Sequence, residues 1–383
     1  MSRLNKITVV GASLAGLRAV QTLRREGFAG EVTLVGAETH VPYNRPPLSK
    51  SVLHGDDDIA LPGAEELDDQ WLRGRKAVHL DTRNRTVTLD DGTEVGHDGL
   101  VIASGARPRR LDGVHTLRTI DDALALRAKL DSGHEHVLVI GGGFIGGEVA
   151  STARQLGRKV TLIGSAPYPM HAGLGEEAAR WLAAHHERNG VELITNVRVT
   201  AVDGGRVRLS DGRTVAADLV VGGMGVLPNT EWLDGSGLAV DDGVLCEPTL
   251  FATGSTDIVA AGDVARWPHT HFGGETVRIE HWSNANEQGA VAARNLLAGA
   301  ENAQPFVDVP NFATHVHGAR IQTAGLPHLA DSASIATGSP EEDRFAVAFT
   351  RDGVPVGAVA VNSPKDLIKL KRAIAAREMP PSP

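Results

Sequence analysis

Two glycine-rich stretches decide the fold of this chain: residues 11–16, with the sequence GASLAG, and residues 141–146, with the sequence GGGFIG. Each follows a short apolar run, ITVV at 7–10 and VLVI at 137–140. Glycines at this spacing allow a tight turn from a strand into a helix, and they let the backbone approach a pyrophosphate at the helix N-terminus. The sequence therefore predicts two dinucleotide-binding motifs.

Both motifs lie in the context of a βαβ unit. Residues 17–25 and 149–156 have the pattern of helices, and the apolar runs at 32–35 and 160–163 are expected to be the second strands. A glycine-rich turn that binds no ligand is the alternative for one such motif. Two motifs in matching contexts favour two bound nucleotides with electron transfer between them.

The rest of the pattern predicts a duplicated plan followed by a smaller domain. Alternating residues before Asp-Gly at 91–92 and at 211–212 indicate one hairpin in each half. From about residue 301 the composition changes to a proline-bounded segment, short strands and a terminal helix. We expect an α/β protein with two Rossmann-like domains and a small α+β C-terminal domain.

Composition excludes several classes of protein. The 383 residues are 42% hydrophobic and 22% charged, as in an ordinary globular protein. Roughly 18 to 20 consecutive apolar residues are needed to span a membrane, and the sequence has no such run and no pattern of a signal peptide at its start. A cytoplasmic location is therefore expected. The net charge of −9 argues against nucleic-acid binding, which needs a basic surface.

Cysteine usage excludes thiol chemistry. The single cysteine, Cys246, permits neither an internal disulfide nor a Cys-x-x-Cys pair, and no cysteine lies near the first glycine motif. We expect Cys246 to be a small packing residue. No metal site is expected, and His315 and His317 are interpreted as surface histidines, because two histidines alone do not make such a site.

Four further motifs carry a resemblance to a known family: RPPLSK at 45–50, ASGARP at 103–108, AGDVA at 261–265 and EHWSNA at 280–285. With the glycine motifs, the chain resembles the FAD-dependent ferredoxin reductases that serve Rieske oxygenases and haem-thiolate monooxygenases, in the glutathione-reductase-like superfamily. The resemblance implies an FAD enzyme that takes a hydride from NAD(P)H and passes single electrons to a [2Fe-2S] ferredoxin, which feeds an oxygenase.

The resemblance also implies where the domains lie. It gives an FAD-binding domain at 1–108 and 230–302, an NAD(P)-binding domain at 109–229 and a C-terminal interface domain at 303–383. The implied FAD contacts are Gly11, Ser13, Leu14, Ala15, Gly16, Glu38, Arg45, Lys50, Val78, Ala103, Ser104, Gly105, Arg127, Gly262, Asp263, Glu280, His281 and Trp282. The implied NAD(P) contacts are Gly141, Gly143, Phe144, Ile145, Gly146, Glu148, Ser165 and Gly225.

Three of these residues are the expected catalytic groups: Lys50, Glu148 and Trp282. In the family a glutamate at the position of Glu148 pairs with the lysine matching Lys50 beside the flavin N5, where the hydride arrives. Trp282 is expected close to the isoalloxazine. The alternative for Glu148 is a solvent-facing position on its helix. From the residues alone, Glu38 is placed to accept a ribose hydroxyl, since an acid is needed roughly twenty residues beyond the glycines.

Two departures from the family limit what the resemblance implies. Family members that prefer NADH have an acid after the second strand of the nicotinamide domain, whereas this chain has Gly164-Ser165-Ala166, so coenzyme preference stays open. The family's Phe-Trp-Ser-Asp-Gln segment is Phe312-Ala313-Thr314-His315-Val316 here, which reshapes the surroundings of the flavin.

The electron acceptor therefore has more than one interpretation. An acidic ferredoxin would be steered by Arg109, Arg110 and the basic cluster at 365–372. A small acceptor such as a quinone, dioxygen or a biosynthetic intermediate is the alternative, and a low-turnover redox sensor is a third. Both a monomer and a homodimer are compatible with the sequence.

Overall fold

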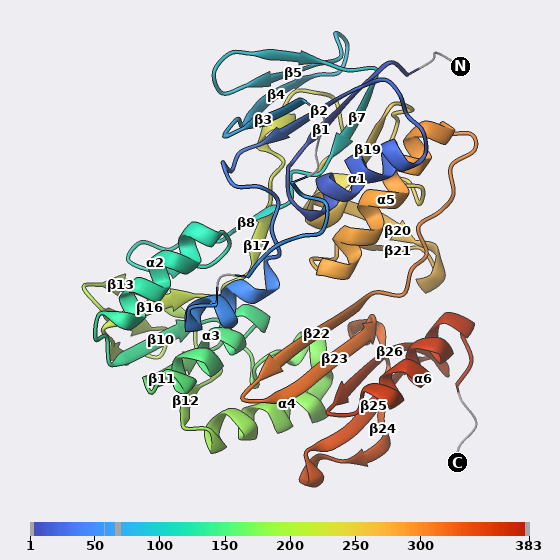
Figure 1. Cartoon of the computed structure of the whole chain (residues 1–383). Helices are drawn as coiled ribbons and strands as arrows, with labels where there is room; N and C mark the ends of the chain where they lie inside the picture. The colour runs from blue at the N-terminus through green and yellow to red at the C-terminus, as the bar shows by residue number, and fades with distance from the viewer. Residues whose placement is uncertain (1–3, 57, 66–69, 380–383) are drawn as a thin grey trace. The chain divides into compact units, whose positions relative to one another are not determined.

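The computed structural model describes residues 4–56, 58–65 and 70–379, and Figure 1 shows its elements. The chain divides into two units, which we describe separately. The first unit contains Met1–Asn44, Ile59–Arg107 and Leu227–Asp308, and the second contains Arg45–Asp58, Pro108–Val226 and Val309–Pro383. The domain boundaries implied by the resemblance stay a prediction.

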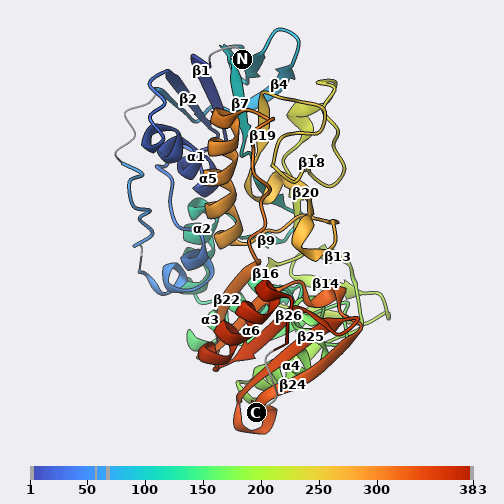
Figure 2. The same ribbon diagram turned by 90° about the vertical axis from the view of Figure 1, so that its right-hand side faces the viewer.

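The first unit is built on a parallel sheet with the strand order β19-β7-β1-β2-β3. Its strands are β1 (Lys6–Val10), β2 (Glu31–Gly36), β3 (Gln70–Arg73), β7 (Gly99–Ile102) and β19 (Ile258–Ala260). The apolar run of β1 lies at the centre because a strand covered on both faces must be apolar throughout. Helices α1 (Leu14–Arg25) and α5 (Trp282–Ala298) pack against each other beside this sheet (Figure 2).

Two smaller sheets complete the first unit. One is the antiparallel set β4 (Ala77–Asp81), β5 (Thr86–Leu89) and β6 (Glu94–Gly96), which confirms the first predicted hairpin. The other contains β18 (Val244–Leu245), β20 (Ala265–His269) and β21 (Glu275–Val277). Short 3-10 helices lie at η3 (Glu231–Leu233), η4 (Gly262–Val264) and η5 (Thr270–Phe272).

The second unit contains a parallel sheet of its own, with the order β12-β11-β10-β16-β9. Its strands are β9 (His115–Thr116), β10 (His136–Ile140), β11 (Lys159–Ile163), β12 (Val191–Ile194) and β16 (Leu219–Gly222). The helices are α2 (Ile120–Asp131), α3 (Phe144–Gln155) and α4 (His171–Arg188). Strands β13 (Val199–Asp203), β14 (Arg206–Leu209) and β15 (Thr214–Ala216) form the second predicted hairpin region.

The two parallel sheets repeat the same plan. In each, the strand before the glycine motif lies between the strand that follows the first helix and a later strand that follows the hairpin sheet. Asp98 accepts hydrogen bonds from the backbone of Asn5 and Lys6 at the start of β1, and Asp218 does the same for Glu135 and His136 at the start of β10. The predicted duplication is thus confirmed down to single side chains.

The C-terminal part of the second unit is an antiparallel sheet with the order β22-β23-β26-β25-β24. It contains β22 (Asn311–Val316), β23 (Ala319–Gly325), β24 (Ser332–Ser339), β25 (Arg344–Arg351) and β26 (Val354–Val361), with 3-10 helices η6 (Pro327–Leu329) and η7 (Pro340–Glu342). Helix α6 (Pro364–Ala376) packs on β26 and β23. The predicted fold class, two Rossmann-like domains with a C-terminal α+β domain, is confirmed.

Two local features differ from simple expectation. Helix α3 begins at Phe144, directly after the glycines and five residues before the predicted start, because Gly143 is its N-cap. The proline-rich stretch at 42–50 contains one 3-10 helix, η1 (Pro46–Ser49), as proline permits at a helix start, and a second, η2 (Ser51–His54), follows it. Strands β8 (Ala106–Pro108) and β17 (Val226–Pro228) form a two-stranded sheet.

Among the described residues, no helix has the length and apolar character to cross a membrane.

Candidate functional site

The first glycine motif is a turn that only glycine permits. Gly11 has φ +117°, and a Cβ on it would lie 2.0 Å from the carbonyl oxygen of Ala103 at the end of β7. A Cβ on Gly16 would lie 1.8 Å from the carbonyl oxygen of Gly11. The first turn of α1 has no acidic residue that would oppose an anion. This cradle therefore fits a pyrophosphate, as the FAD prediction requires.

Glu38 follows β2 on the same sheet and is fixed in place. The Tyr43 hydroxyl donates a hydrogen bond of 2.6 Å to Oε2 of Glu38, which is half-buried. Tyr43 is itself buried. A carboxylate held in this way is suited to accept a ribose hydroxyl. The sequence argument selected Glu38 but missed Tyr43, which only the folded loop brings to it.

Gly262 and Asp263 lie against the same motif. A Cβ on Gly262 would lie 3.1 Å from the Ala15 side chain, and one on Gly289 of α5 would lie 2.3 Å from the Ala15 carbonyl oxygen. The amide of Gln288 holds this approach, since its Oε1 accepts a 2.9 Å hydrogen bond from the Gly262 backbone. The structure thus brings two predicted FAD motifs together, although they are far apart in sequence.

Residues of the segment at 278–282 interact with Asp263. Arg278 donates to the Asp263 carbonyl oxygen at 3.2 Å and forms an ion pair of 2.7 Å with Glu280. Burial lowers the pKa of His281 to about 4, against a smaller opposing effect of the Asp263 charge. Trp282 begins α5 and is 41% exposed, so its ring is accessible. Arg278 is a residue that the sequence argument missed.

The predicted small residues at the end of β7 are held by Asn229. The Ser104 hydroxyl donates to the Asn229 carbonyl oxygen at 2.8 Å, and the Asn229 side chain donates back to the Ser104 carbonyl oxygen at 2.8 Å. The Asn229 backbone N–H also donates to the Gly105 carbonyl oxygen. Val78 lies on β4 and is 46% exposed. Its predicted contact with adenine stays a prediction.

The second glycine motif repeats the first. Gly141 has φ +102°, and a Cβ on it would lie 2.3 Å from the carbonyl oxygen of Gly223, while one on Gly146 would lie 1.9 Å from the carbonyl oxygen of Gly141. Gly143 is the N-cap of α3 and offers no side chain, so the helix N-terminus stays accessible to an anion. These residues also fit a pyrophosphate.

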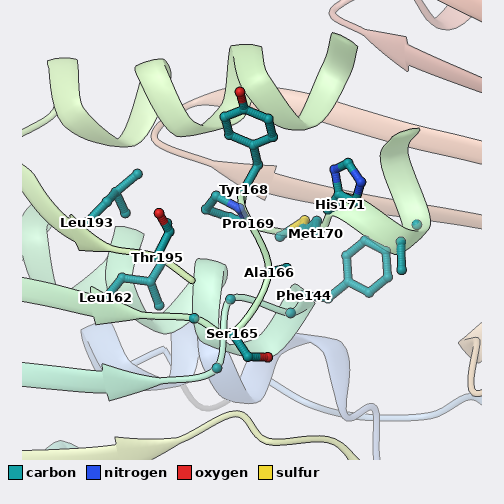
Figure 3. A pocket seen from close by; sticks show the side chains of 16 residues that line it. Phe144, Leu162, Ser165, Ala166, Tyr168, Pro169, Met170, His171, Leu193 and Thr195 are labelled. Carbon is teal, nitrogen blue, oxygen red and sulfur yellow. The ribbon is translucent and has the colours of Figure 1, made fainter. Parts of the chain in front are cut away.

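A cavity of about 340 Å³ opens at this motif. It lies at the carboxyl ends of β10 and β11, where open α/β sheets bind their ligands. Figure 3 shows along its wall Ser165 and Tyr168, from the loop after β11, and His171, the first residue of α4. The lining residues are Gly141, Gly142, Gly143, Phe144, Leu162, Gly164, Ser165, Ala166, Tyr168, Pro169, Met170, His171, Ala172, Gly173, Leu193 and Thr195. We infer that this cavity is where the predicted NAD(P) site begins.

Glu148 is buried on α3 and has three side-chain partners. Its Oε2 atom lies 2.7 Å from Nζ of Lys50 and accepts a hydrogen bond from the Ser49 hydroxyl. Its Oε1 atom accepts a hydrogen bond from the Thr314 hydroxyl. Only 3% of Glu148 is exposed, so the solvent-facing alternative is wrong and the predicted pairing with Lys50 is present.

The neighbours of this pair hold it in position. Thr152, one turn further along α3, donates a 2.8 Å hydrogen bond to the Ser49 carbonyl oxygen, and Lys50 also donates to the Pro46 carbonyl oxygen at 2.8 Å. The Phe144 ring lies 4.0 Å from the Phe312 ring, centroid to centroid. Ser49, which precedes the selected Lys50, and Thr314 are functional candidates that the sequence argument passed over.

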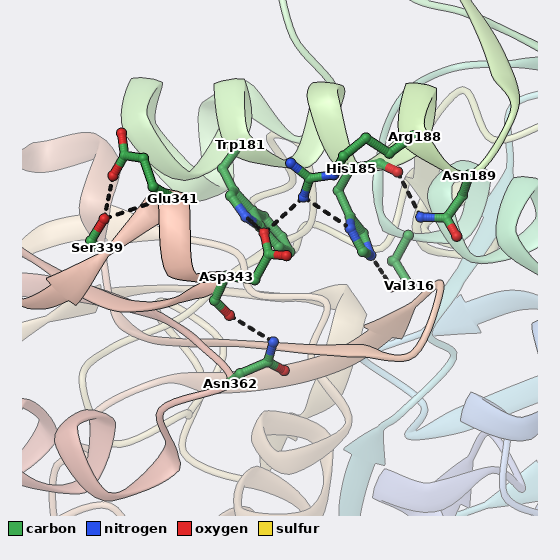
Figure 4. Close-up of polar contacts among 9 residues, drawn as sticks. All are labelled: Trp181, His185, Arg188, Asn189, Val316, Ser339, Glu341, Asp343 and Asn362. Carbon is green, nitrogen blue, oxygen red and sulfur yellow. Dashed lines mark hydrogen bonds and ion pairs between the residues drawn. The ribbon is translucent and has the colours of Figure 1, made fainter.

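A polar network joins α4 to the C-terminal sheet (Figure 4). Asp343 accepts hydrogen bonds from the Trp181 indole at 2.6 Å and from Arg188 at 2.7 Å. His185 contacts the Val316 carbonyl oxygen at 3.3 Å through Nε2. Figure 4 shows these side chains projecting from α4 toward the sheet that carries Thr314.

The two histidines that were predicted to lie on the surface, His315 and His317, differ in their exposure. His315 is exposed, as expected, whereas His317 is half-buried against α4, where its Nε2 lies 3.0 Å from Nδ1 of His186. The expectation is therefore wrong for His317, because α4 covers the turn after β22. Within the described residues, no group of three or more His, Cys, Asp or Glu side chains is arranged to hold a metal ion.

Four other predicted residues lie in the second unit. Arg45 donates to the Arg118 carbonyl oxygen, and Arg127 donates to the Val52 carbonyl oxygen at 3.2 Å. Ile145 of α3 is 41% exposed, and Gly225 has φ +82° in the segment before β17. Arg45, Lys50 and Arg127 belong to a different unit from the first glycine motif, so their role toward the flavin stays a prediction.

Comparisons with known proteins agree with this geometry. The chain matches the model of the pyridine nucleotide-disulphide oxidoreductases over residues 5–289 and that of a reductase C-terminal domain over residues 312–383. It is 37% identical over 389 residues to the ferredoxin–NAD(+) reductase component of the p-cumate 2,3-dioxygenase system of Pseudomonas putida, covering 98% of this chain and 94% of that protein.

Two further relatives extend this agreement. The chain is 36% identical over 395 residues to rhodocoxin reductase of Rhodococcus erythropolis, covering 98% of this chain and 91% of that protein. The covalent putidaredoxin reductase–putidaredoxin complex matches with a TM-score of 0.90 and 30% identity, over 97% of this chain and 93% of the matched chain. This chain belongs to the pyridine nucleotide-disulphide oxidoreductase family.

Proposed function

We propose that this chain is an FAD-dependent NAD(P)H:ferredoxin reductase that passes electrons singly to a [2Fe-2S] ferredoxin, which supplies an oxygenase. The observation that carries the proposal is the ion pair between Lys50 and the buried Glu148, on the helix that follows the second glycine motif. The names of the relatives, reductase components of dioxygenase systems and a reductase in complex with putidaredoxin, support the nature of the partner.

The two glycine motifs divide the binding task. The loop at 11–16, with Glu38 and Asp263, would hold FAD, and the loop at 141–146 would hold NAD(P)H with its pyrophosphate at the N-terminus of α3. When bound, the flavin supplies the chemistry that accepts a hydride and releases electrons one at a time. The protein supplies orientation and electrostatics.

Glu148 is the residue that positions Lys50. With its two oxygens bonded to Ser49, Thr314 and Lys50, the carboxylate has little freedom to move. The Lys50 ammonium is therefore held at a fixed point, still partly accessible with 28% of its side chain exposed. A fixed cation favours the arrival of negative charge in a hydride transfer without needing to reorganise.

The chain lacks the thiols that disulfide-type members of its family use. Cys246 is the only cysteine, it is buried, and its burial raises the pKa of the thiol to about 12. A thiol with so high a pKa is not a nucleophile or redox carrier at neutral pH. In this proposal no thiol would relay electrons from the bound flavin, and the exposed Trp282 would lie on the path to the acceptor.

Two basic clusters suit an acidic ferredoxin. Arg109 and Arg110 are exposed, and so are Lys365, Lys369 and Arg372 on α6. All five belong to the second unit, which also contains the Lys50–Glu148 pair. Such clusters raise the rate of encounter with a partner of opposite charge.

Anaerobic stopped-flow reduction of the purified holoprotein tests the proposal. We expect NADH or NADPH to bleach the flavin absorbance, and subsequent mixing with a [2Fe-2S] ferredoxin to reduce the cluster within the same turnover. A protein that purifies without flavin, or a reduced flavin that never passes electrons to any ferredoxin, would refute it.

A small acceptor is the second candidate. Strand β22 presents an exposed Ala313 where the family has tryptophan, which removes a large ring from this surface. Steady-state turnover with quinones and dioxygen, measured beside turnover with a ferredoxin, separates the two candidates. A redox sensor would show reduction without turnover in any of these assays.

The proposed location is the cytoplasm. The buried and unpaired state of Cys246 supports it, because disulfides are rare in reducing compartments. Fractionation of the native host, followed by immunodetection, tests this location. Recovery in an extracytoplasmic fraction would overturn it.

A further inference from the structure

The internal duplication of the chain identifies the position that would read the coenzyme ribose. In the first sheet Val10 pairs with Val35, and in the second Ile140 pairs with Ile163. Glu38 lies three residues after Val35, so its counterpart is Ala166, three residues after Ile163. One βαβ unit therefore ends its second strand with an anchored carboxylate, and the other does not.

The whole wall of the NAD(P) cavity shares this lack of charge. The segment after β11 is Gly164-Ser165-Ala166, and all three residues line the cavity. None of the described lining residues is Asp, Glu, Lys or Arg, and His171 is the only histidine among them. An acid here accepts the ribose 2′-hydroxyl and repels a 2′-phosphate, whereas an arginine binds the phosphate. The cavity contains neither.

Arg180 of α4 lies near Tyr168, which lines the cavity, but its guanidinium has other partners. Arg180 lies 5.9 Å from the centroid of the Tyr168 ring, and it forms ion pairs with Glu176 and Glu177. Those two carboxylates compete with any phosphate for its guanidinium. Arg180 therefore contributes little selectivity for a 2′-phosphate.

We propose that the segment Gly164-Ser165-Ala166 makes this reductase non-selective between NADH and NADPH. This inference rests on the proposed function only in taking the second glycine motif as the nicotinamide coenzyme site. Without the repelling acid and the attracting arginine, the values of kcat/KM for the two coenzymes should agree within about tenfold, which corresponds to about 1.4 kcal/mol.

Gly164 offers a direct way to install selectivity. A Cβ built on it meets only the backbone nitrogen of Gly142, at 3.9 Å, which is ordinary van der Waals contact, and its φ is not in the left-handed region. The first side-chain atom of a glutamate is therefore sterically tolerated there. We expect Gly164→Glu to lower kcat/KM for NADPH at least tenfold more than it lowers kcat/KM for NADH. Gly164→Gln, with the same bulk and no charge, should leave the two coenzymes within tenfold of each other.

Binding without turnover separates this inference from the proposed function. Calorimetric titration of the oxidised holoprotein with ADP-ribose and with 2′-phospho-ADP-ribose needs no electron acceptor, so it reads the cavity alone. We expect Kd values within tenfold of each other for the wild type and for Gly164→Gln, and selective loss of the phosphorylated ligand in Gly164→Glu. Ala166→Glu, at the counterpart of Glu38, repeats the test if Gly164→Glu does not fold.

Three results would overturn the proposal. One is a wild-type preference above tenfold for either coenzyme in kcat/KM or in Kd. The second is equal loss of NADPH use in Gly164→Glu and Gly164→Gln, which would show that bulk and not charge matters. The third is retention of the phosphorylated ligand by both glutamate variants. Failure to reduce any ferredoxin would refute the proposed function and leave these binding results intact.

Discussion

The Thr314 hydroxyl donates a hydrogen bond to Oε1 of Glu148, so a strand of the C-terminal sheet touches the carboxylate that holds Lys50. Both Thr314 and Glu148 are buried. A hydrogen bond to a buried charged group contributes more than one between neutral groups. The C-terminal sheet thus contributes a side chain, Thr314, to the candidate site around Glu148 and Lys50.

Replacement of Thr314 should loosen the pair. Thr314→Val retains the shape and removes the hydroxyl, so we expect a loss of about 1.5–3 kcal/mol in the free energy of unfolding and slower flavin reduction by NADH. Chemical denaturation and stopped-flow absorbance measure the two effects. Thr314→Ser should restore the rate, because it retains the donor. Equal rates in the Val and Ser variants would contradict a positioning role.

The Lys50–Glu148 pair should behave as one unit. Glu148→Gln and Lys50→Met should each slow flavin reduction at least tenfold, and the double variant should be no slower than the worse single variant. Because Lys50 is partly exposed, the coupling in stability should be below the 3–5 kcal/mol typical of breaking a fully buried pair. A double-mutant cycle measures both quantities. Additive losses would show that the two residues act independently.

Stability should fall in mild acid because of the histidines at α4. Burial lowers the pKa of His186 to about 3 and that of His317 to about 4, and it also lowers the pKa of His185. Arg154 adds to the effect on His317, and Arg188 adds to that on His185, where the Asp343 charge opposes it.

The free energy of unfolding falls with decreasing pH because the unfolded chain binds more protons than the folded chain. Between pH 6.5 and these lower pKa values the unfolded chain binds protons that the folded chain does not, so stability is constant above pH 6.5 and falls below it. His186 alone should cost up to about 2 kcal/mol at pH 5. Thermal melts from pH 8 to pH 5 measure the slope. His317→Gln should make the slope shallower by the share of this one group, whereas His328→Gln, at an exposed position, should leave the slope unchanged.

Electron transfer to an acidic ferredoxin should depend on salt. Screening shortens the range of charge interactions to about 10 Å at 0.1 M, so the second-order rate constant should fall as salt rises. Charge reversal of Lys369 and Arg372 on α6 should lower the rate at low salt and flatten the salt dependence. Arg83→Glu, on the exposed turn between β4 and β5, is the matched control. A rate that salt does not change would exclude this docking surface.

Cys246 should be dispensable for catalysis. Cys246→Ala should keep the rates of flavin reduction and ferredoxin reduction within twofold, because the thiol is buried and its raised pKa keeps it protonated. A thiol reagent should label the wild type only after unfolding. Rapid labelling of the native protein, or loss of activity in the variant, would contradict this.

The family resemblance implied the pairing of Lys50 with Glu148, and the sequence by itself determined the two nucleotide motifs and the duplicated plan. These follow from local rules: glycine spacing at residues 11–16 and 141–146, the alternation of apolar residues, and motifs that a family shares. Each needs only neighbours along the chain to be recognised, which is why the expected strands and helices agree with the structure.

Only the tertiary structure decided what surrounds those residues. Thr314 lies 166 positions from Glu148, Asp343 lies 155 positions from Arg188, and His317 lies 131 positions from His186. No local pattern links such pairs, because their contact depends on how the C-terminal sheet packs on α3 and α4. Burial is a property of the packed chain. It is the largest cause of the lowered pKa of His186, and it turns the Glu148 carboxylate from a possible surface charge into the fixed anchor of Lys50.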